Sequence, residues 1–316
     1  MDKRKLLTYG LLGLCALATI LGLIQLFKGP NTATAKADKP GLEIPKMGKS
    51  GIAVVYIYGD IYVERQSSVF PGFMEGADSI VDRLRKLGKN PNVKAVVLRI
   101  NSPGGSTGAS QEIYEEVKKL RAKNIKVIVS MGDVGASGAY YISCPADKII
   151  ANPSTITGSI GVIFNFGNME ELFKKIGVKF EVVKSGNNKD IGAFWRAPRA
   201  EERKLLQGMI DNTYEQFVNA VAEGRKMPVE KVKELADGSI FTGEQALKLG
   251  LVDQLGNFPD AIQEAGRMAG LGDDPYIIKD YSSAEKIWEM FGRKFDEGSL
   301  NKLVEKTSTR LAYILE

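Results

Sequence analysis

The chain has 316 residues, of which 44% are hydrophobic and 26% are charged, a composition typical of folded proteins. Histidine is absent and only two cysteines are present, which excludes a Ser–His–Asp triad, a Cys–His pair, histidine-ligated metal sites and Cys-X-X-Cys sites. The net charge of +5 arises within residues 1–50, which carry eight basic and three acidic residues, so residues 51–316 are formally neutral and offer no evident basic surface to a nucleic acid.

The first predicted element is residues 6–27, a run of 22 residues without a charge. As a helix it would span about 33 Å, slightly more than the hydrocarbon core of a bilayer. Residues 3–5 are Lys-Arg-Lys, and the positive-inside rule keeps such a basic end in the cytoplasm. We therefore expect residues 1–28 to be a cytoplasmic stub and a single-pass anchor in the cytoplasmic membrane, with the rest of the chain outside. The alternative is a cleaved signal peptide, but the apolar run exceeds the usual roughly 7–15 residues.

Residues 29–50 contain three prolines and no sustained hydrophobic period, which indicates a linker. From residue 51, apolar strands alternate with amphipathic helices, which predicts an α/β domain with buried, largely parallel strands over residues 51–270. Residues 271–316 are expected to form a helical extension, whose apolar face indicates core packing or a subunit contact. The expected strands are residues 52–58, 93–100, 126–131, 148–151, 161–166 and 179–184, and the main expected helices are residues 77–87, 110–123 and 201–225.

Small residues surround Ser137 at the end of the third predicted strand. Gly135 and Ala139 flank it at two residues on either side, close to the G-x-S-x-G pattern of a nucleophile on a sharp strand-to-helix turn. Small neighbours let the backbone bend there and let a substrate approach. A serine that only caps the following helix is the alternative interpretation.

A second loop of small residues, Asn101–Ser106, follows another predicted strand. Its glycines can present bare backbone N–H groups to an oxyanion. Because the carboxyl ends of parallel strands meet at one edge of a sheet, we expect this loop and the Ser137 turn to lie close together. An ordinary strand-to-helix turn would contain the same residue types.

A serine nucleophile in this chain needs a base other than histidine. Carboxylates are weak bases at neutral pH, whereas a desolvated lysine can lose its proton near pH 7–8. Two lysines, Lys184 and Lys189, lie in a segment with apolar and aromatic residues. Spacing alone does not choose between them.

Several motifs, taken together, resemble those of the bacterial signal peptide peptidase A family. The combination is highly specific, although Asn-Ser-Pro-Gly-Gly also occurs in the related Clp protease. The motifs run in chain order: Arg99–Gly105, Ser137–Tyr141, Ala146–Ile149, Asn152–Val162, and Lys184–Gly186 followed by Lys189-Asp190.

The resemblance implies a serine endopeptidase with a Clp/crotonase-type superhelix of ββα-like units. It implies Ser137 as the nucleophile and Lys189 as the general base. Gly104 and Gly138 would supply the N–H groups of the oxyanion hole, and Ser159 would orient Lys189 by accepting a hydrogen bond.

The same resemblance bears on partners. Short members of the family assemble into homo-oligomeric rings whose sites are completed across subunits, so Ser137 and Lys189 are expected to meet within one subunit or between neighbours. The expected substrates are cleaved signal peptides and other extended peptides at the membrane surface. No cofactor and no metal is implied.

Two other functions fit the same fold. A crotonase-like acyl-CoA enzyme would also stabilise an oxyanion with backbone N–H groups, but it needs neither the Ser137–Lys189 pair nor an anchor. A non-catalytic membrane scaffold would normally have lost the nucleophile. Reaction with a serine-directed fluorophosphonate separates both from a peptidase.

Overall fold

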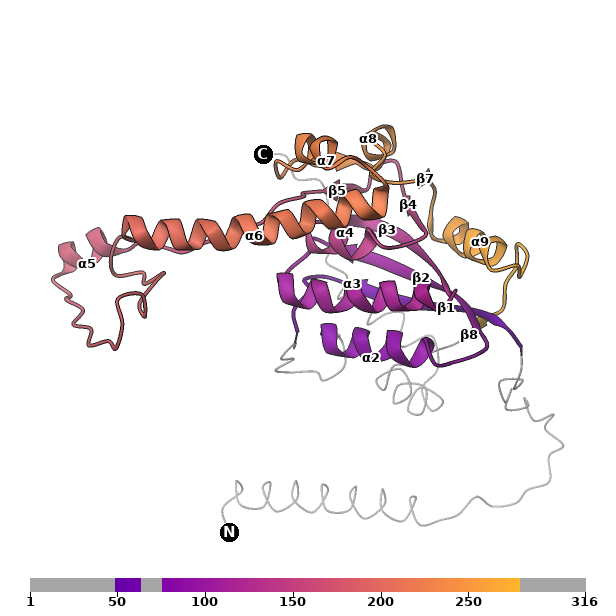
Figure 1. Ribbon diagram of the computed structural model, residues 1–316, viewed down its shortest axis with the longest axis horizontal. Helices are drawn as coiled ribbons and strands as arrows, with labels where there is room; N and C mark the ends of the chain where they lie inside the picture. The colour runs from indigo at the N-terminus through magenta and orange to yellow at the C-terminus, as the bar shows by residue number, and fades with distance from the viewer. Residues whose placement is uncertain (1–48, 64–75, 279–316) are drawn as a thin grey trace, which may run out of the picture. The chain divides into compact units, whose positions relative to one another are not determined.

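An eight-stranded sheet forms the centre of the computed structural model, which describes residues 49–63 and 76–278 (Figure 1). The strand order is β6-β5-β3-β2-β1-β8, and β4 pairs with both β3 and β7. The pairs are parallel except β5–β6, which is antiparallel. The strands are β1 (Gly51–Tyr58), β2 (Val93–Ser102), β3 (Lys126–Ala136), β4 (Lys148–Ala151), β5 (Ile156–Gly158), β6 (Ile240–Thr242), β7 (Gln254–Leu255) and β8 (Ile277–Ile278).

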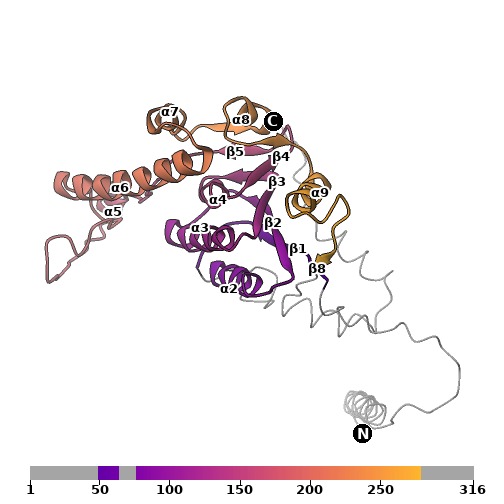
Figure 2. The same ribbon diagram turned by 45° about the vertical axis from the view of Figure 1, so that its right-hand side comes forward.

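Helices cover both faces of this sheet. Figure 2 shows α2, α3 and α4 on one face and α9 on the other. The long helix α6 meets the body of the protein at its C-terminal half, where Phe217, Val218 and Val221 are buried. The helices are α2 (Ala77–Leu87), α3 (Thr107–Ala122), α4 (Gly138–Ser143), α5 (Glu170–Ile176), α6 (Ala200–Arg225), α7 (Val229–Leu235), α8 (Gly243–Lys248) and α9 (Phe258–Met268).

Strand β2 shows why the sheet needs both layers. Leu98 and Ile100 belong to the large core shared with α2 and α3, whereas Ala95 and Val97 belong to a smaller core shared with α9. Successive side chains of a strand point to opposite faces, so a strand that is apolar at nearly every position must be covered twice. The predicted α/β class with buried, largely parallel strands is confirmed.

Two expected strands differ from the structure. Residues 161–166 and 179–184 carry neither a strand nor a helix. The second of these segments lies in a part that we call the arm, residues 169–199, which comprises α5 and the loop that follows it. In both Figure 1 and Figure 2 the arm lies at the N-terminal end of α6, away from α4.

The predicted anchor at residues 6–27 and the apolar face expected at residues 300–315 lie outside the described residues. In the part of the chain that the structure describes, no helix combines the length and the apolar character needed to span a bilayer.

Candidate active site

Ser137 occupies the sharp turn between β3 and α4. Its backbone angles are φ 53° and ψ −123°, in a region that side-chain-bearing residues seldom adopt and that costs about 1–3 kcal/mol. The turn is held on both sides: the Ser137 N–H donates to the Gly158 carbonyl at 2.9 Å, and the Ser137 carbonyl accepts from the Tyr141 N–H at 2.9 Å. The predicted strand-to-helix turn is therefore present.

Neighbouring elements fix this turn in place. The last residues of β3 pair with β5, with Ala136 opposite Gly158, and the buried Thr157 hydroxyl donates to the Gly135 carbonyl at 2.7 Å. On the helix side, Tyr140 is fully buried and its hydroxyl donates to the Leu251 carbonyl at 2.8 Å. A strained backbone persists only where its surroundings determine it this strongly.

The loop after β2 packs directly against the Ser137 turn, as its small residues predict. A Cβ on Gly104 would lie 2.6 Å from the Gly138 nitrogen and 2.9 Å from the Ser137 Cβ, and Gly104 has φ +102°. A Cβ on Gly138 would lie 2.5 Å from the Ser110 hydroxyl. At Gly104 only glycine fits without a shift of the backbone, whereas a side chain at Gly138 would displace the Ser110 hydroxyl.

The backbone N–H groups of Gly104 and Gly105 differ in whether they already donate a hydrogen bond. The Gly104 N–H donates to the buried Ser102 hydroxyl at 3.1 Å. The Gly105 nitrogen lies 3.2 Å from the position of a Gly138 Cβ, and its N–H has no hydrogen-bond acceptor among the described residues. The Gly105 N–H is thus the unengaged donor on this side of Ser137, one residue beyond the predicted Gly104.

Ser137 opens into a cavity of about 420 Å³. Its lining includes Gly138 and Ser159, together with the aromatic side chains of Tyr141, Tyr214 and Phe217. Ser159 also has a positive φ, 49°, and its N–H donates to the Ser239 carbonyl at 2.8 Å. Among the described residues, no lysine lines this cavity.

Lys189 lies in the arm rather than at the Ser137 cavity. It is exposed, and its N–H closes a turn with the Gly186 carbonyl at 3.2 Å. Both views place the loop between α5 and α6 away from α4 (Figures 1 and 2). Within one subunit the structure therefore brings together Ser137, Gly104, Gly138 and Ser159, but not Lys189.

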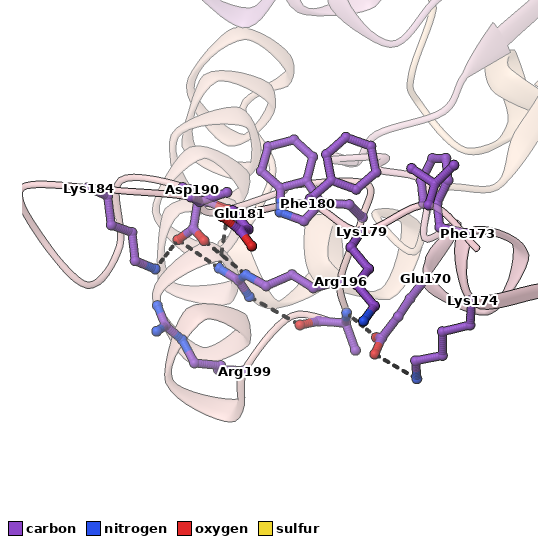
Figure 3. Close-up of a pocket in the computed structure, with 14 residues that line it drawn as sticks. Glu170, Phe173, Lys174, Lys179, Phe180, Glu181, Lys184, Asp190, Arg196 and Arg199 are labelled. Atoms are coloured by element: carbon purple, nitrogen blue, oxygen red, sulfur yellow. Dashed lines mark hydrogen bonds and ion pairs between the residues drawn. The ribbon is translucent and has the colours of Figure 1, made fainter. Parts of the chain in front are cut away.

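The arm contains a second cavity of about 610 Å³, with a charged side and an aromatic side (Figure 3). On the charged side, the Arg196 guanidinium and the Lys184 ammonium hold the pKa of Asp190 well below its usual range. Hydrogen bonds from Arg196 lower the pKa of the neighbouring Glu202 to about 2. This charged group was not among the predicted site residues, although Lys184, Asp190, Arg196 and Glu202 alternate in charge at a spacing of six residues.

Comparisons with known proteins match this architecture. The profile of peptidase family S49 matches residues 119–272, and the profile of Clp protease matches residues 53–155. A putative signal peptide peptidase SppA of Enterococcus faecium is 37% identical over 259 residues, which cover 82% of this chain and 74% of that protein.

Other relatives match over less of their own length. A putative protease of Synechocystis is 54% identical over 180 residues, which cover 57% of this chain and 65% of that protein. Protease 4 of Salmonella typhi is 39% identical over 230 residues, which cover 73% of this chain but 36% of that protein. This chain thus spans less than two thirds of these two relatives.

The predicted family, enzyme class and Clp-like fold are confirmed by these matches. The similarity to the Enterococcus protein, which extends over four fifths of the chain, shows that this protein belongs to peptidase family S49, among serine proteases of the SppA type.

Proposed function

We propose that this chain is a membrane-anchored endopeptidase that cleaves remnant signal peptides and other extended peptides through a Ser137–Lys189 dyad. The observation that supports it best is the strained turn of Ser137, which opens into a cavity and lies against the backbone of the glycine-containing loop after β2. Nucleophiles of acyl-transfer enzymes occupy such turns because the hydroxyl is exposed while the neighbouring N–H groups point at the reacting carbonyl.

The proposed reaction is acyl transfer. The neutral amine of Lys189 removes the proton of the Ser137 hydroxyl, and the Ser137 oxygen attacks the scissile carbonyl carbon. The tetrahedral intermediate then collapses, the peptide C–N bond breaks, and the leaving amine takes the proton from Lys189. Water, activated by the same lysine, hydrolyses the acyl-enzyme and restores Ser137.

The oxyanion of the intermediate is received by backbone N–H groups. The Gly138 N–H follows the nucleophile directly and begins α4, where the helix dipole favours negative charge. The second donor comes from the Gly104–Gly105 pair. The Gly104 N–H already donates to Ser102, so the Gly105 N–H is the donor that requires no rearrangement.

Lys189 reaches Ser137 from a neighbouring subunit in this proposal, and Ser159 accepts a hydrogen bond that orients it. Two observations support an assembly completed in this way. The Ser137 cavity is lined by no lysine of the described part of its own chain. The arm also leaves large apolar side chains in solvent, including Val183, which is fully exposed, and Ile176, which is 60% exposed. Exposed apolar surface of this kind marks interaction sites, and a closed ring would cover it.

The substrate and the location follow from the same features. A cavity lined by Tyr141, Tyr214 and Phe217 favours apolar side chains. Apolar peptides are abundant at a membrane surface, where the uncharged run at residues 6–27 would hold the enzyme with its catalytic domain on the outer face.

The test is labelling with a fluorophosphonate, which reacts with activated serines. The full-length wild-type protein should be labelled on Ser137 and should hydrolyse an apolar peptide, and Ser137→Ala should do neither. Ser143→Ala is the matched control, because that hydroxyl is buried and donates to the Ala139 carbonyl at 2.7 Å. A wild-type protein that assembles but is not labelled would favour an acyl-CoA enzyme or a scaffold.

A further inference from the structure

The turn that carries Lys189 is tied to the start of α6 by charged side chains. Asp190, the next residue in the chain, accepts from the Lys184 ammonium at 2.6 Å and from the Arg196 Nε at 3.0 Å. Figure 3 shows both cations converging on the Asp190 carboxylate. The Asp190 side chain is only 9% exposed, so these contacts are shielded from solvent and are stronger than ordinary surface ion pairs.

Glu202 forms the second half of this arrangement. Its side chain is fully buried in the first turn of α6 and accepts from Arg196 at 2.6 and 2.8 Å. It also accepts from the Arg199 guanidinium at 2.6 Å and from the Arg199 N–H at 2.8 Å. Arg196 therefore bridges the carboxylates of Asp190 and Glu202, and the planar guanidinium fixes their relative positions.

The residues on the other side of Lys189 are tied as well. The Asn187 carbonyl accepts from the Lys184 ammonium at 3.1 Å and from the Arg199 guanidinium. The Asn188 side-chain oxygen accepts from Arg199 at 3.3 Å. We call Lys184, Asp190, Arg196, Arg199 and Glu202 the arm clamp.

The Lys189 side chain takes no part in these contacts. Its side chain is exposed and makes no hydrogen bond or ion pair within the part of the chain that the structure describes. The two carboxylates of the arm clamp, Asp190 and Glu202, already accept hydrogen bonds from its cations. The surrounding backbone is thus held rigidly, while the one lysine at its tip is left without a carboxylate partner.

We propose that the arm clamp positions Lys189 for delivery to the Ser137 site of a neighbouring subunit, with Arg196 as its central residue. This inference rests on the proposed role of Lys189 as general base. A base must reach the proton that it removes, and a misplacement of about 1 Å can lower the rate roughly 100-fold. The clamp holds the turn at fixed geometry before the subunits meet. Lys184, the other candidate base, serves the clamp instead.

The test is peptide hydrolysis by the full-length protein in detergent. For Arg196→Gln we expect kcat to fall about 10- to 100-fold, with KM within about twofold, because the Ser137 cavity lies outside the arm. Arg196→Lys should recover part of kcat, because an ammonium keeps the charge but lacks the planar fork of N–H donors with which Arg196 meets both carboxylates. Arg203→Gln is the matched control: it makes the same change of charge on the same helix, at an exposed side chain without an ion pair among the described residues, and kcat should not change.

Subunit mixing separates positioning from a general loss of structure. When Arg196→Gln and Ser137→Ala chains are co-expressed and mixed assemblies are purified by two tags, the intact arm of one chain should serve the serine of the other. Random mixing should then restore activity to about one quarter of the wild-type level. Absence of any recovery would overturn the proposal, because the intact arm of one chain would then not serve the serine of its neighbour.

Lys189→Arg, measured in parallel, keeps the two proposals apart. If Lys189→Arg is inactive but Arg196→Gln turns over within about twofold of the wild type, the clamp proposal alone is overturned. If Lys189→Arg is active, the proposed function is wrong. Should Arg196→Gln fail to assemble, Lys184→Met and Asp190→Asn are judged by the same fall in kcat, and wild-type turnover of both assembled variants overturns the clamp.

Discussion

At the scale of single residues, backbone strain distinguishes the predicted site serines from the other residues of their type. Four non-glycine residues of the described part of the chain have a positive φ: Asn124, Ser137, Ser159 and Lys226. Lys226 ends α6 in the left-handed conformation and Asn124 follows the end of α3, where such geometry commonly terminates a helix. Ser137 and Ser159 terminate no helix, and both line the same cavity. Backbone strain at residues that line a cavity is of the kind that clusters at functional sites.

The chemistry of Lys189 leads to a sharp prediction at this scale. The proposed mechanism needs an amine at residue 189 that can take the proton of the Ser137 hydroxyl and give it to the leaving group. Lys189→Arg should lower kcat by about 10²–10⁴-fold, because a guanidinium keeps the charge but does not lose its proton in a protein. The measurement is peptide hydrolysis by purified variants of equal assembly state.

Lys184→Arg is the control for this substitution. It keeps a cation beside Asp190, which Lys184 contacts at 2.6 Å, and its activity should stay much closer to the wild type. A Lys189→Arg enzyme with near-wild-type turnover would falsify the dyad.

At the scale of elements, the loop after β2 and the turn before α4 act as one unit. Gly104→Ala places a methyl group 2.6 Å from the Gly138 nitrogen at a residue with φ +102°. We expect the substitution to displace the oxyanion donors and to lower the rate of fluorophosphonate labelling at least tenfold, equivalent to about 1.4 kcal/mol. Labelling kinetics and thermal unfolding, measured together, show whether the site is lost while the fold remains.

Gly108→Ala is the matched control for the same loop-helix segment. Gly108 lies in the first turn of α3, and nothing lies within 4 Å of a Cβ placed there. Alanine is the better helix former by up to about 1 kcal/mol, so this variant should be equally active and as stable as the wild type or more so. Unchanged labelling of Gly104→Ala would show that the loop does not supply a donor.

Elements whose pattern is set by the core could be predicted from the sequence. Helix α2 matches its predicted range, and strands β1 and β2 differ from theirs by one or two residues, because continuous apolar runs and amphipathic periods report burial directly. The Ser137 turn and the Gly104 loop could be placed at one sheet edge because the carboxyl ends of parallel strands lie at the same edge.

The prediction failed where structure depends on a partner element. Residues 161–166 and 179–184 have the apolar, β-branched composition of strands, yet a strand forms only beside an edge that accepts its hydrogen bonds. In the described part of the chain, neither segment pairs with a strand of the sheet. The contacts of Asp190, Arg196 and Glu202 were not predicted for a related reason. Ion pairs within a loop depend on how the loop folds back on α6, and they leave only a weak pattern in the sequence.

At the scale of the whole molecule, the sheet and the arm differ in how far their apolar side chains are buried. Strands β2 to β4 are covered by helices on both faces, and nearly all of their apolar side chains are buried. The arm exposes Phe180 and Phe194, each more than 40% exposed, in an aromatic cluster with Phe173 and Trp195. Exposed apolar surface of this extent is typical of interaction sites. In the proposed ring, the arm of a second copy of this chain would bring Lys189 to the Ser137 cavity, which no lysine of the described residues of its own chain lines.

Val183→Asp tests that dependence on assembly. Val183 is fully exposed in the isolated chain, so an aspartate there costs the folded subunit little. In a subunit contact the same carboxylate would lose its hydration without a partner, at a cost of about 2 kcal/mol or more. We therefore expect the wild type in detergent to scatter light as a closed oligomer, and Val183→Asp to give smaller species with at least tenfold lower activity and an unchanged circular dichroism spectrum.

Tyr58→Asp, at a side chain that is 53% exposed on β1 and outside the arm, should keep both the assembly and the activity. An active wild-type monomer, or a Val183→Asp variant that assembles and cleaves peptide normally, would show that Ser137 does not depend on a neighbouring arm.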